Sequence, residues 1–578
     1  MQDLIIEALK GATGEKEINL EIPENEDFGD YSSNIALGMG ENPRQTAEKI
    51  IGQLKEDKEL MEVVEKVEMA GPGFINFWIK KDALVDNLMQ IDRGKEKYGG
   101  SDLGKGKTVV IDYSSPNIAK PFGIGHLRST IIGQALYNLY KSLGYEVIGD
   151  NHLGDWGTQF GKLIYMIKKE NLQDFNIDKL EQLYIEFHKL AEDPAKVEEM
   201  KSGAREWFKK LEKGDIEAKN IWQKCVDVSM AEFNKIYGLL GIKIDFALGE
   251  SYYESEMKQM EQDKSVRDHL VRGGDNAWII DLTEFGIKIP LMFLKSDGAT
   301  TYATRDLATI KFRVRKWNPD IIIYEVGAEQ SLHFKQLFAA ARLLDLVKKP
   351  VKLVHTAHGL YLAPDGKKFS TRKGKTIKLE EVLVEAIRRA HDIAMKRGLE
   401  RIEDASKMGD KIKGEHIVEG KSVRAKIDEQ VGIGAIKYYD LMHSVQSNVV
   451  FDWSKMMNLE GNSGPYLQYT IARTNSVLAK ADKQSAGKLV NRLNNEEISV
   501  LRTLIHYPEV VKQAAENFSP NLLANYLFDL AQKYNNFYNN HRILEGDNRE
   551  FRLELTSATG QVLKNGLKIL GIPTPEKM

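Results

Sequence analysis

Apolar and polar positions follow two successive patterns across residues 108–139. Residues 108–111 (TVVI) form a β-branched apolar run, which is typical of a buried strand. A polar loop with prolines and glycines follows, and from Leu127 to Leu139 apolar residues recur at helical spacing. The pattern therefore predicts a strand, a loop and a helix. The first turn of that helix would present free N–H groups and a positive dipole end, which suit a phosphate, although an ordinary turn gives the same pattern.

The same arrangement of an apolar strand and a polar, glycine-containing loop recurs along the chain. Further strands are predicted at residues 145–148, 321–326 and 353–356, and shorter β-like runs at 242–246, 278–282 and 287–294 look like an insertion. Residues 162–240 are helical in pattern and highly charged, as expected of solvated helix faces. We therefore expect an α/β fold with a parallel sheet, and a ligand site where the strands end at their carboxyl edge.

The flanking regions differ from this pattern. Residues 28–36 predict a turn leading into a helix, and residues 67–79 a strand after the turn Gly71-Pro72-Gly73, which together indicate a small α+β domain. A glycine-rich, charged linker is expected at 91–104, and from about 380 onward the pattern is helical. The domains expected are an N-terminal domain at 1–90, a central domain at 105–380, a helical connector at 381–450 and a helical domain at 451–578.

Composition narrows the class of protein. With 42% apolar and 29% charged residues and a net charge of −3, the 578-residue chain has the balance of a soluble globular protein. No apolar run reaches membrane-spanning length, and the N-terminus (MQDLIIEALKG) lacks a signal-peptide layout, so no membrane is expected as a partner. The single cysteine, Cys225, excludes an internal disulfide and fits a reducing cytoplasm. We expect it to be a helix residue rather than a nucleophile.

Polar side chains gather after three of the predicted strands. Asp112, Ser114, Asn117 and His126 follow the first strand, and His152 and Asp155 follow the second, at what would be a shared sheet edge. Tyr302 and Asp306 begin a later helix, where an aspartate alone is most often a cap or a dipole partner. A basic loop with Gly366 and Gly374 follows the last strand and, by itself, would be ordinary solvated surface.

These clusters also carry a resemblance. SSPNIAKPFGIGHLRST resembles the first signature of class I aminoacyl-tRNA synthetases in its arginyl-tRNA synthetase form, with Gly123 in place of the first histidine of His-x-Gly-His. GKKFSTRKG resembles the second signature, Lys-Met-Ser-Lys-Ser, without its second lysine. Tyr302, Asp306 and Gln330 match the family in residue type and spacing, and the flanking domains resemble its N-terminal and anticodon-binding domains. The resemblance implies a Rossmann-like class I catalytic domain that contains insertions.

The resemblance also implies a reaction and a set of site residues. Arginine would be activated by ATP and transferred to tRNA, with Mg²⁺ on the ATP phosphates and no metal bound by the protein itself. Asp306 would clamp the guanidinium, because a carboxylate accepts two parallel hydrogen bonds from that fork. The implied residues are His126 and Lys368 for catalysis; Asp112, Ser114, Asn117, Tyr302, Asp306 and Gln330 for arginine; Gly123, Gly125, His126, Lys368, Ser370 and Arg372 for ATP; and Tyr31, Asn34, Tyr466 and Tyr469 for tRNA.

Several alternatives stay open at the level of sequence. The cation that faces the pyrophosphate is one of Lys367, Lys368, Arg372 or Lys373. Tyr466 and Tyr469, three residues apart on one helical face, fit core packing as well as base stacking. The chain could instead be an adenylate-forming or nucleotidyl-transferring enzyme that uses no RNA, or a non-catalytic RNA-binding relative, for which Gly123 is the hint. A monomer is expected.

Overall fold

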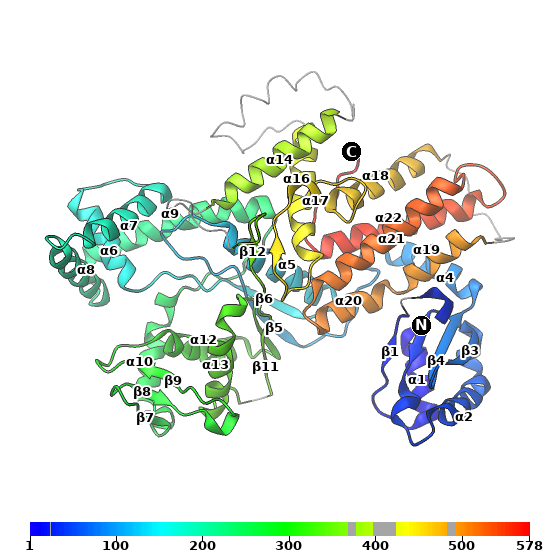
Figure 1. The fold of residues 1–578 in the computed structure, drawn as a ribbon, viewed down its shortest axis with the longest axis horizontal. Coiled ribbons are helices and arrows are strands. Elements are labelled where there is room, and N and C mark those ends of the chain that lie inside the picture. The colour runs from blue at the N-terminus through cyan, green and yellow to red at the C-terminus, as the bar shows by residue number, and fades with distance from the viewer. Residues whose placement is uncertain (24, 349, 368–376, 397–422, 482–492) are drawn as a thin grey trace.

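The structure is a computed structural model that describes the whole chain except residues 24, 349, 368–376, 397–422 and 482–492. The parallel sheet lies near the middle of the molecule (Figure 1). Two insertions extend to one side of it, while the C-terminal helices and then the N-terminal domain extend to the other. The central sheet therefore lies between the insertions and the C-terminal helices.

The central sheet has four parallel strands in the order β11-β10-β5-β6. These strands are β5 (Thr108–Asp112), β6 (Glu146–Asp150), β10 (Ile321–Tyr324) and β11 (Lys352–His355). Asp112 pairs with Asp150 on one side and with Tyr324 on the other, so the strands end at one level. The sequence-predicted parallel sheet is confirmed, and its carboxyl edge brings together loops that are far apart in the chain.

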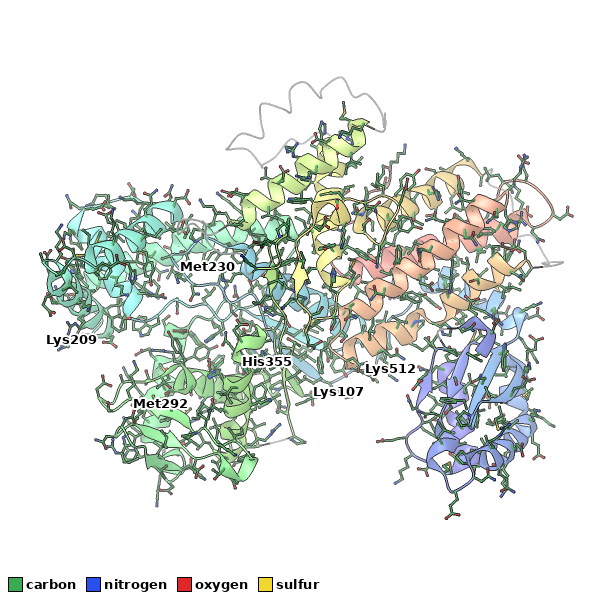
Figure 2. The ribbon with its side chains drawn as sticks, in the orientation of Figure 1. Lys107, Lys209, Met230, Met292, His355 and Lys512 are labelled. Carbon is green, nitrogen blue, oxygen red and sulfur yellow. The ribbon has the colours of Figure 1, made fainter. Side chains whose placement is uncertain are left out.

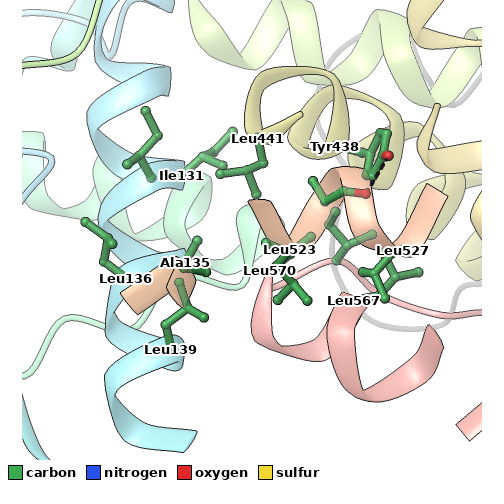
Figure 3. Close-up of a cluster of buried hydrophobic side chains, with 14 of the residues drawn as sticks. Ile131, Ala135, Leu136, Leu139, Tyr438, Leu441, Leu523, Leu527, Leu567 and Leu570 are labelled. Carbon is green, nitrogen blue, oxygen red and sulfur yellow. Dashed lines mark hydrogen bonds between the residues drawn. The ribbon is translucent and has the colours of Figure 1, made fainter. Parts of the chain in front are cut away.

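Helix α5 (Leu127–Ser142) joins the central sheet region of the molecule to its C-terminal helices. In Figure 3, Ile131, Ala135 and Leu139 of α5 meet Leu441, Leu523 and Leu570 from three C-terminal helices. All of these side chains are buried, and α5 is buried on nearly every face rather than along one stripe, so its polar residues Arg128, Ser129 and Gln134 are buried as well. Truncating one of these leucines to alanine should cost about 2–5 kcal/mol of folding free energy.

The two insertions have different architectures. The first, after β6, is helical and contains α6 (Thr158–Lys169), α7 (Ile177–Ala191), α8 (Val197–Glu212) and α9 (Ile216–Leu240). The second contains α10 (Glu254–Gln262), α11 (Lys264–Arg267) and an antiparallel sheet of β7 (Leu270–Arg272), β8 (Trp278–Ile280) and β9 (Leu291–Leu294). Met230 of α9 and Met292 of β9 mark them in Figure 2. The strand predicted at 242–246 is wrong, because Phe246 forms only an isolated bridge with Asp150.

Two helices of the central region follow the second insertion and flank β10. They are α12 (Tyr302–Trp317) and α13 (Ser331–Leu343). After β11, the short strand β12 (Tyr361–Leu362) pairs in parallel with β13 (Val449–Val450). The loop after the last central strand is thereby tied to the start of the C-terminal region.

The N-terminal domain is a four-stranded antiparallel sheet covered by helices, in the order β1-β2-β4-β3. Its elements are α1 (Gln2–Thr13), β1 (Leu20–Glu21), β2 (Tyr31–Ser33), α2 (Pro43–Glu56), α3 (Lys58–Val63), β3 (Val64–Ala70), β4 (Phe74–Ile79) and α4 (Lys81–Gly94). The turn and helix predicted over residues 28–36 are only partly confirmed, because Tyr31–Ser33 form a strand that pairs with β4 and only a short 3₁₀ helix (Ile35–Gly38) follows. The expected linker also begins inside α4, which ends at Gly94.

The C-terminal region is helical, as predicted. It comprises α14 (Leu379–Lys396), α16 (Val423–Leu441), α17 (Trp453–Met456), α18 (Gly464–Lys480), α19 (Asn495–Ile505), α20 (Tyr507–Glu516), α21 (Pro520–Asn540) and α22 (Arg549–Ile569). Cys225 is a buried helix residue of α9, and burial raises the pKa of its thiol to about 12, which disfavours a nucleophilic role. Among the described residues, no helix is both long and apolar enough to cross a membrane.

Candidate active site

The loop that leaves β5 is held in an unusual backbone conformation. Ser114, Ser115 and Ala119 have φ values of +74°, +43° and +63°, in the left-handed region that costs a non-glycine residue about 1–2 kcal/mol. Hydrogen bonds from surrounding elements hold them there: their N–H groups donate to Ser129 Oγ (2.9 Å), Asn151 Oδ1 (3.0 Å) and Ser229 Oγ (2.9 Å), respectively. Backbone held against its preference is a frequent property of functional loops.

His126 lies where this loop becomes α5. A single 3₁₀ turn (Ile124–His126) precedes the helix, and the imidazole packs 5.2 Å from the Phe122 ring. Burial lowers the pKa of His126, so its neutral form dominates near pH 7, and Nδ1 is buried with no partner among the described residues. Gly125 is exposed, with no atom within 4 Å of where a Cβ would lie. This turn has room for a ligand and unused hydrogen-bonding capacity.

Gly123 has ordinary extended backbone, with φ of −88° and ψ of 161°. It forms an antiparallel bridge with Lys378, and the neighbouring Ile124 N–H donates to the Ile377 carbonyl. Any residue adopts this conformation, so the backbone does not require glycine here.

A buried ion cluster lies beneath the sheet edge. Arg313 of α12 is fully buried, with Nη2 2.7 Å from Asp112 Oδ2 and Nε 2.9 Å from Asp150 Oδ2. Ser115 Oγ donates to the other oxygen of Asp112 at 2.9 Å. Burial raises the pKa of Asp150 despite Arg313, as expected where desolvation outweighs pairing. Both oxygens of Asp112, predicted for arginine binding, thus have partners within the protein.

Polar atoms around this cluster have unused hydrogen-bonding capacity. Tyr324 lies with its ring 5.2 Å from the Arg313 guanidinium, and the ring of Tyr253 lies 5.5 Å from that of His152. Both tyrosine hydroxyls, His152 Nδ1 and Arg313 Nη1 are buried without partners in the part of the chain that the structure describes. Buried polar groups are rarely left unpaired in proteins, so their concentration at one sheet edge favours a polar ligand site.

Asp306 of α12 lies between a histidine of the loop after β6 and a histidine at the start of α13. Thr301 and Thr304 form the capping box of α12, so Asp306, one turn into the helix, is not its cap. His333 Nε2 lies 2.6 Å from Asp306 Oδ2, and His152 Nε2 lies 4.0 Å from Oδ1. About a quarter of the side chain is exposed. The carboxylate is therefore oriented by one imidazole while it still has an accessible surface.

The two other residues predicted with Asp306 are exposed. Tyr302 is 72% exposed, and Gln330 is also exposed. The Arg305 guanidinium lies 5.8 Å from the Tyr302 ring and 3.9 Å from the Glu250 carboxylate, whose pKa burial raises to about 7. Tyr302 and Asp306 belong to α12 and Gln330 directly precedes α13, so the predicted trio lies at the starts of the two helices that flank β10.

The other predicted residues of the first loop divide into an exposed and a buried one. Asn117 is exposed and its backbone bridges to Gly154 in the loop after β6. Ser114 is buried, and its hydroxyl lies 2.8 Å from the Tyr237 hydroxyl and accepts from Thr130 Oγ1 at 2.9 Å. The Ser114 hydroxyl is therefore already hydrogen-bonded within the protein, whereas the Asn117 side chain is exposed to solvent.

The basic loop of the second signature is described only in part. Residues 359–367 include β12, and the Ala363 N–H donates to the Lys367 carbonyl at 2.8 Å. Lys368, Ser370 and Arg372, predicted for ATP, lie outside the described residues.

Three family models match successive parts of the chain. The model "tRNA synthetases class I (R), catalytic domain" matches residues 87–453, "DALR anticodon binding domain" matches 467–578, and "Arginyl tRNA synthetase N terminal domain" matches 1–79. The arginine–tRNA ligase of Fusobacterium nucleatum is 38% identical over 97% of this chain and 96% of its own. That of Lactococcus lactis is 38% identical over 99% and 98%.

The chain belongs to the arginyl-tRNA synthetase family. The solved arginyl-tRNA synthetase of Plasmodium falciparum covers 100% of this chain and 98% of its own, with a TM-score of 0.80 and 26% identity. The Thermus thermophilus enzyme, with a TM-score of 0.80, 22% identity and full coverage of both chains, agrees in fold. The family and the fold class predicted from the signatures are confirmed.

One residue predicted to contact tRNA has a different position in this synthetase. Tyr31 is fully buried between domains, its hydroxyl 3.1 Å from Glu509 and its ring edge-on to His506. Asp30 beside it is also buried and pairs with Arg502. The prediction for Tyr31 is wrong, because a ring without exposed surface has no face for a base. The interdomain pairing was not visible in the local sequence.

The other predicted tRNA contacts are partly exposed. Asn34 follows β2 and is half-buried. Tyr466 and Tyr469 occupy the first turns of α18, where the Tyr466 hydroxyl accepts from Asn535 at 2.9 Å and the Arg473 guanidinium lies 5.1 Å from the Tyr469 ring. Neither tyrosine is fully buried, so each keeps some accessible surface.

Sequence reasoning missed three members of the site: His333, Arg313 and Asp150. Their chemistry depends on contacts between elements that are distant in the sequence. Two local signals were present. Asp150 comes just after a predicted strand, and His333 follows the loop after another predicted strand, near the start of a helix.

Proposed function

We propose that this chain attaches arginine to tRNA in two steps. The arginine carboxylate attacks the α-phosphorus of ATP, which forms arginyl-adenylate and releases pyrophosphate. The 2′-hydroxyl of the terminal tRNA adenosine then attacks the adenylate carbonyl and releases AMP. The observation that carries the proposal is the Asp306 carboxylate, oriented by His333 at the sheet edge and still accessible.

The arginine site is proposed around that carboxylate. Asp306 would accept hydrogen bonds from the guanidinium, and its accessible Oδ1 lies on the side of His152. Tyr302, Asn117 and Gln330 are exposed side chains of the same edge and would contact the rest of the substrate. Asp112 and Ser114 would shape the site from beneath through the contacts with Arg313 and Tyr237.

The ATP site is proposed at the start of α5. Its free N–H groups and positive dipole end would face the phosphates, next to Gly123 and Gly125. The neutral His126 would donate to the charge that develops on the α-phosphate, and the second-signature residues Lys368, Ser370 and Arg372 would contact the pyrophosphate. Mg²⁺, held by the ATP phosphates, would neutralise part of their charge. Among the described residues there is no group of three or more metal-ligating side chains for an ion of the protein's own.

The RNA partner is proposed to be tRNA specific for arginine. The family match of residues 467–578 to an anticodon-binding domain supports this, with Tyr466 and Tyr469 as stacking partners for bases and Asn34 as a contact of the N-terminal domain. We further propose that the chain acts as a monomer in the cytoplasm.

Aminoacylation of total tRNA with each of the twenty amino acids tests the proposal. Arginine alone should be attached. An enzyme that forms arginyl-adenylate but leaves every tRNA uncharged would support the RNA-independent adenylate-forming alternative. A protein that binds tRNA but catalyses no arginine-dependent exchange of pyrophosphate into ATP would be a non-catalytic relative.

A further inference from the structure

Helix α9 contacts the first-signature loop with two side chains from its second half. The Tyr237 hydroxyl lies 2.8 Å from Ser114 Oγ and accepts from Asn151 Nδ2 at 3.0 Å. About two helical turns earlier in α9, Ser229 Oγ accepts a hydrogen bond from the Ala119 N–H at 2.9 Å. Ser114 and Ala119 are two of the residues with left-handed backbone. The position of α9 therefore bears directly on the strained loop.

The last residue of α9 is tied to the C-terminal end of the chain by one buried amine. Lys437 of α16 is fully buried, and its Nζ donates to the Leu240 carbonyl at 2.7 Å and to the Gly571 carbonyl just after α22. The Leu240 carbonyl is the last of α9 and lacks a partner within the helix, whereas Gly571 lies two residues past the end of α22. Burial lowers the pKa of Lys437 to about 7, but the amine retains at least two N–H donors in either charge state.

One side of this contact is open. An open cavity of about 670 Å³ is lined by residues 238–241 at the end of α9 and residues 571–574 after α22. A Cβ placed on Gly571 would lie 2.9 Å from Lys437 Nζ, so the contact leaves no room for a side chain. The end of α22 is also held to α5, because Asn138 donates to the Ile569 carbonyl at 3.0 Å.

From these contacts we infer that Lys437 and Tyr237 are positioning residues for arginine activation: Lys437 fixes the end of α9 against the C-terminal domain, and Tyr237 transmits that position to the first-signature loop. Neither residue is placed against substrate. The inference rests on the proposed activity. It assigns to the C-terminal domain, beyond RNA binding, a role in holding the catalytic loop in its strained conformation.

Two substitutions test the two ends of this connection in the full-length protein. Tyr237→Phe removes the hydroxyl and keeps the ring against Phe122. Lys437→Met keeps the length and apolar stem of the side chain and removes the donors, with Lys437→Arg as the conservative control. Both Phe and Met variants should slow arginine-dependent pyrophosphate exchange by about tenfold in kcat, with KM for arginine within about threefold, as for a loss confined to the transition state. The arginine control should recover most of the rate.

The double variant shows whether the two residues act through one connection or affect the rate independently. If the residues act through one another, Tyr237→Phe with Lys437→Met should be no more than about threefold slower than the slower single variant, because the second change finds the link already broken. Losses that multiply, or a rise in KM for arginine with kcat unchanged, would overturn the inference. If the wild type itself attaches no arginine, the proposed function fails instead, and the two failures are thereby distinguished.

Lys437→Met could fail to fold, so a second variant tests the same contact while keeping the lysine. Gly571→Ala places a methyl group against Nζ and should reproduce the loss of kcat. Gly14→Ala is its matched control, since Gly14 also follows a helix in left-handed backbone, with φ of +75° against +67° for Gly571, and has no atom within 4 Å of its Cβ position. Wild-type kcat in a folded Gly571→Ala variant would overturn the inference.

Discussion

Nε2 of His333 lies 2.6 Å from Oδ2 of Asp306, and this contact decides how the proposed guanidinium site is oriented. A carboxylate only accepts hydrogen bonds, so Nε2 carries the proton. His333 therefore uses one carboxylate oxygen and leaves the other facing His152 at 4.0 Å. A bound guanidinium would meet a carboxylate that is already rotated into place.

Asp306→Asn should greatly weaken the use of arginine. The amide keeps the shape of the side chain but removes the charge opposite the guanidinium, and we expect kcat/KM for arginine to fall by about 2–4 kcal/mol in transition-state free energy. Steady-state pyrophosphate exchange measures this, with the exposed helix residue Asp86→Asn as control. Kinetics within threefold of the wild type would remove Asp306 from the pocket.

His333→Phe should weaken arginine binding without removing charge. The ring volume stays, but the hydrogen bond that orients Asp306 is lost, and we expect KM for arginine to rise by the equivalent of about 1–3 kcal/mol, as for a hydrogen bond to a charged group. His333→Gln, which retains a donor, should lose less. Equal losses in the Phe and Gln variants would show that the imidazole acts by packing alone.

His126→Ala should slow adenylate formation while arginine affinity stays nearly constant. Deleting one transition-state donor typically costs about 10²–10³ in rate. Single-turnover formation of arginyl-adenylate, with tRNA present, measures the step, and the exposed His269→Ala is a suitable control. A variant that loses arginine binding but retains normal chemistry would contradict the role given to His126.

Gly123→His should fold and should bring no large gain in rate. The backbone at Gly123 is extended, so histidine fits its conformation, and every other described part of the first signature is in place. We therefore expect a change in adenylate formation of less than about threefold, small beside the effect of removing a real transition-state donor. Acceleration of tenfold or more would mean that the site lacks a phosphate donor at this position.

Acid should destabilise the interface between the N-terminal and C-terminal domains through His506. Burial, chiefly, lowers the pKa of His506 to about 3, so below its ordinary value near 6.5 the unfolded state binds the proton and the folded state does not. The stability contributed by this group is complete above pH 6.5 and falls by up to about 1.4 kcal/mol for each pH unit below it. Urea midpoints at pH 7, 6 and 5 measure the loss. His506→Phe, which keeps a ring beside Tyr31, should show a shallower dependence.

The sequence was sufficient to predict the parallel sheet and its loops because these depend on local patterns. The apolar run at β5 and the helical spacing after Leu127 are each contained within about twenty residues. The position of Tyr302 and Asp306 at a helix start was predictable in the same way, since only the nearby Thr301 and Thr304 compete for the cap.

Contacts between elements that are distant in the chain could not be predicted from local sequence patterns. Arg313 and Asp150 are 163 residues apart, and only the register of the assembled sheet brings the guanidinium to that carboxylate. Tyr31 and Glu509 are 478 residues apart, so nothing near Tyr31 distinguished a buried interdomain ring from an exposed RNA contact. Residue type indicated hydrogen-bonding capacity in both cases, but not the partner.

The burial of α5 against the last helices has a consequence for synthesis on the ribosome. Asn138 and its acceptor Ile569 are separated by 431 residues. At about 5–20 residues per second, roughly 20–90 s pass between the emergence of the two. During this delay the apolar face of α5 that later meets Leu523 and Leu570 has no native cover. Nascent chains stalled before residue 507 should therefore be cleaved by protease near α5 and captured by chaperones, whereas the released full-length chain should resist both.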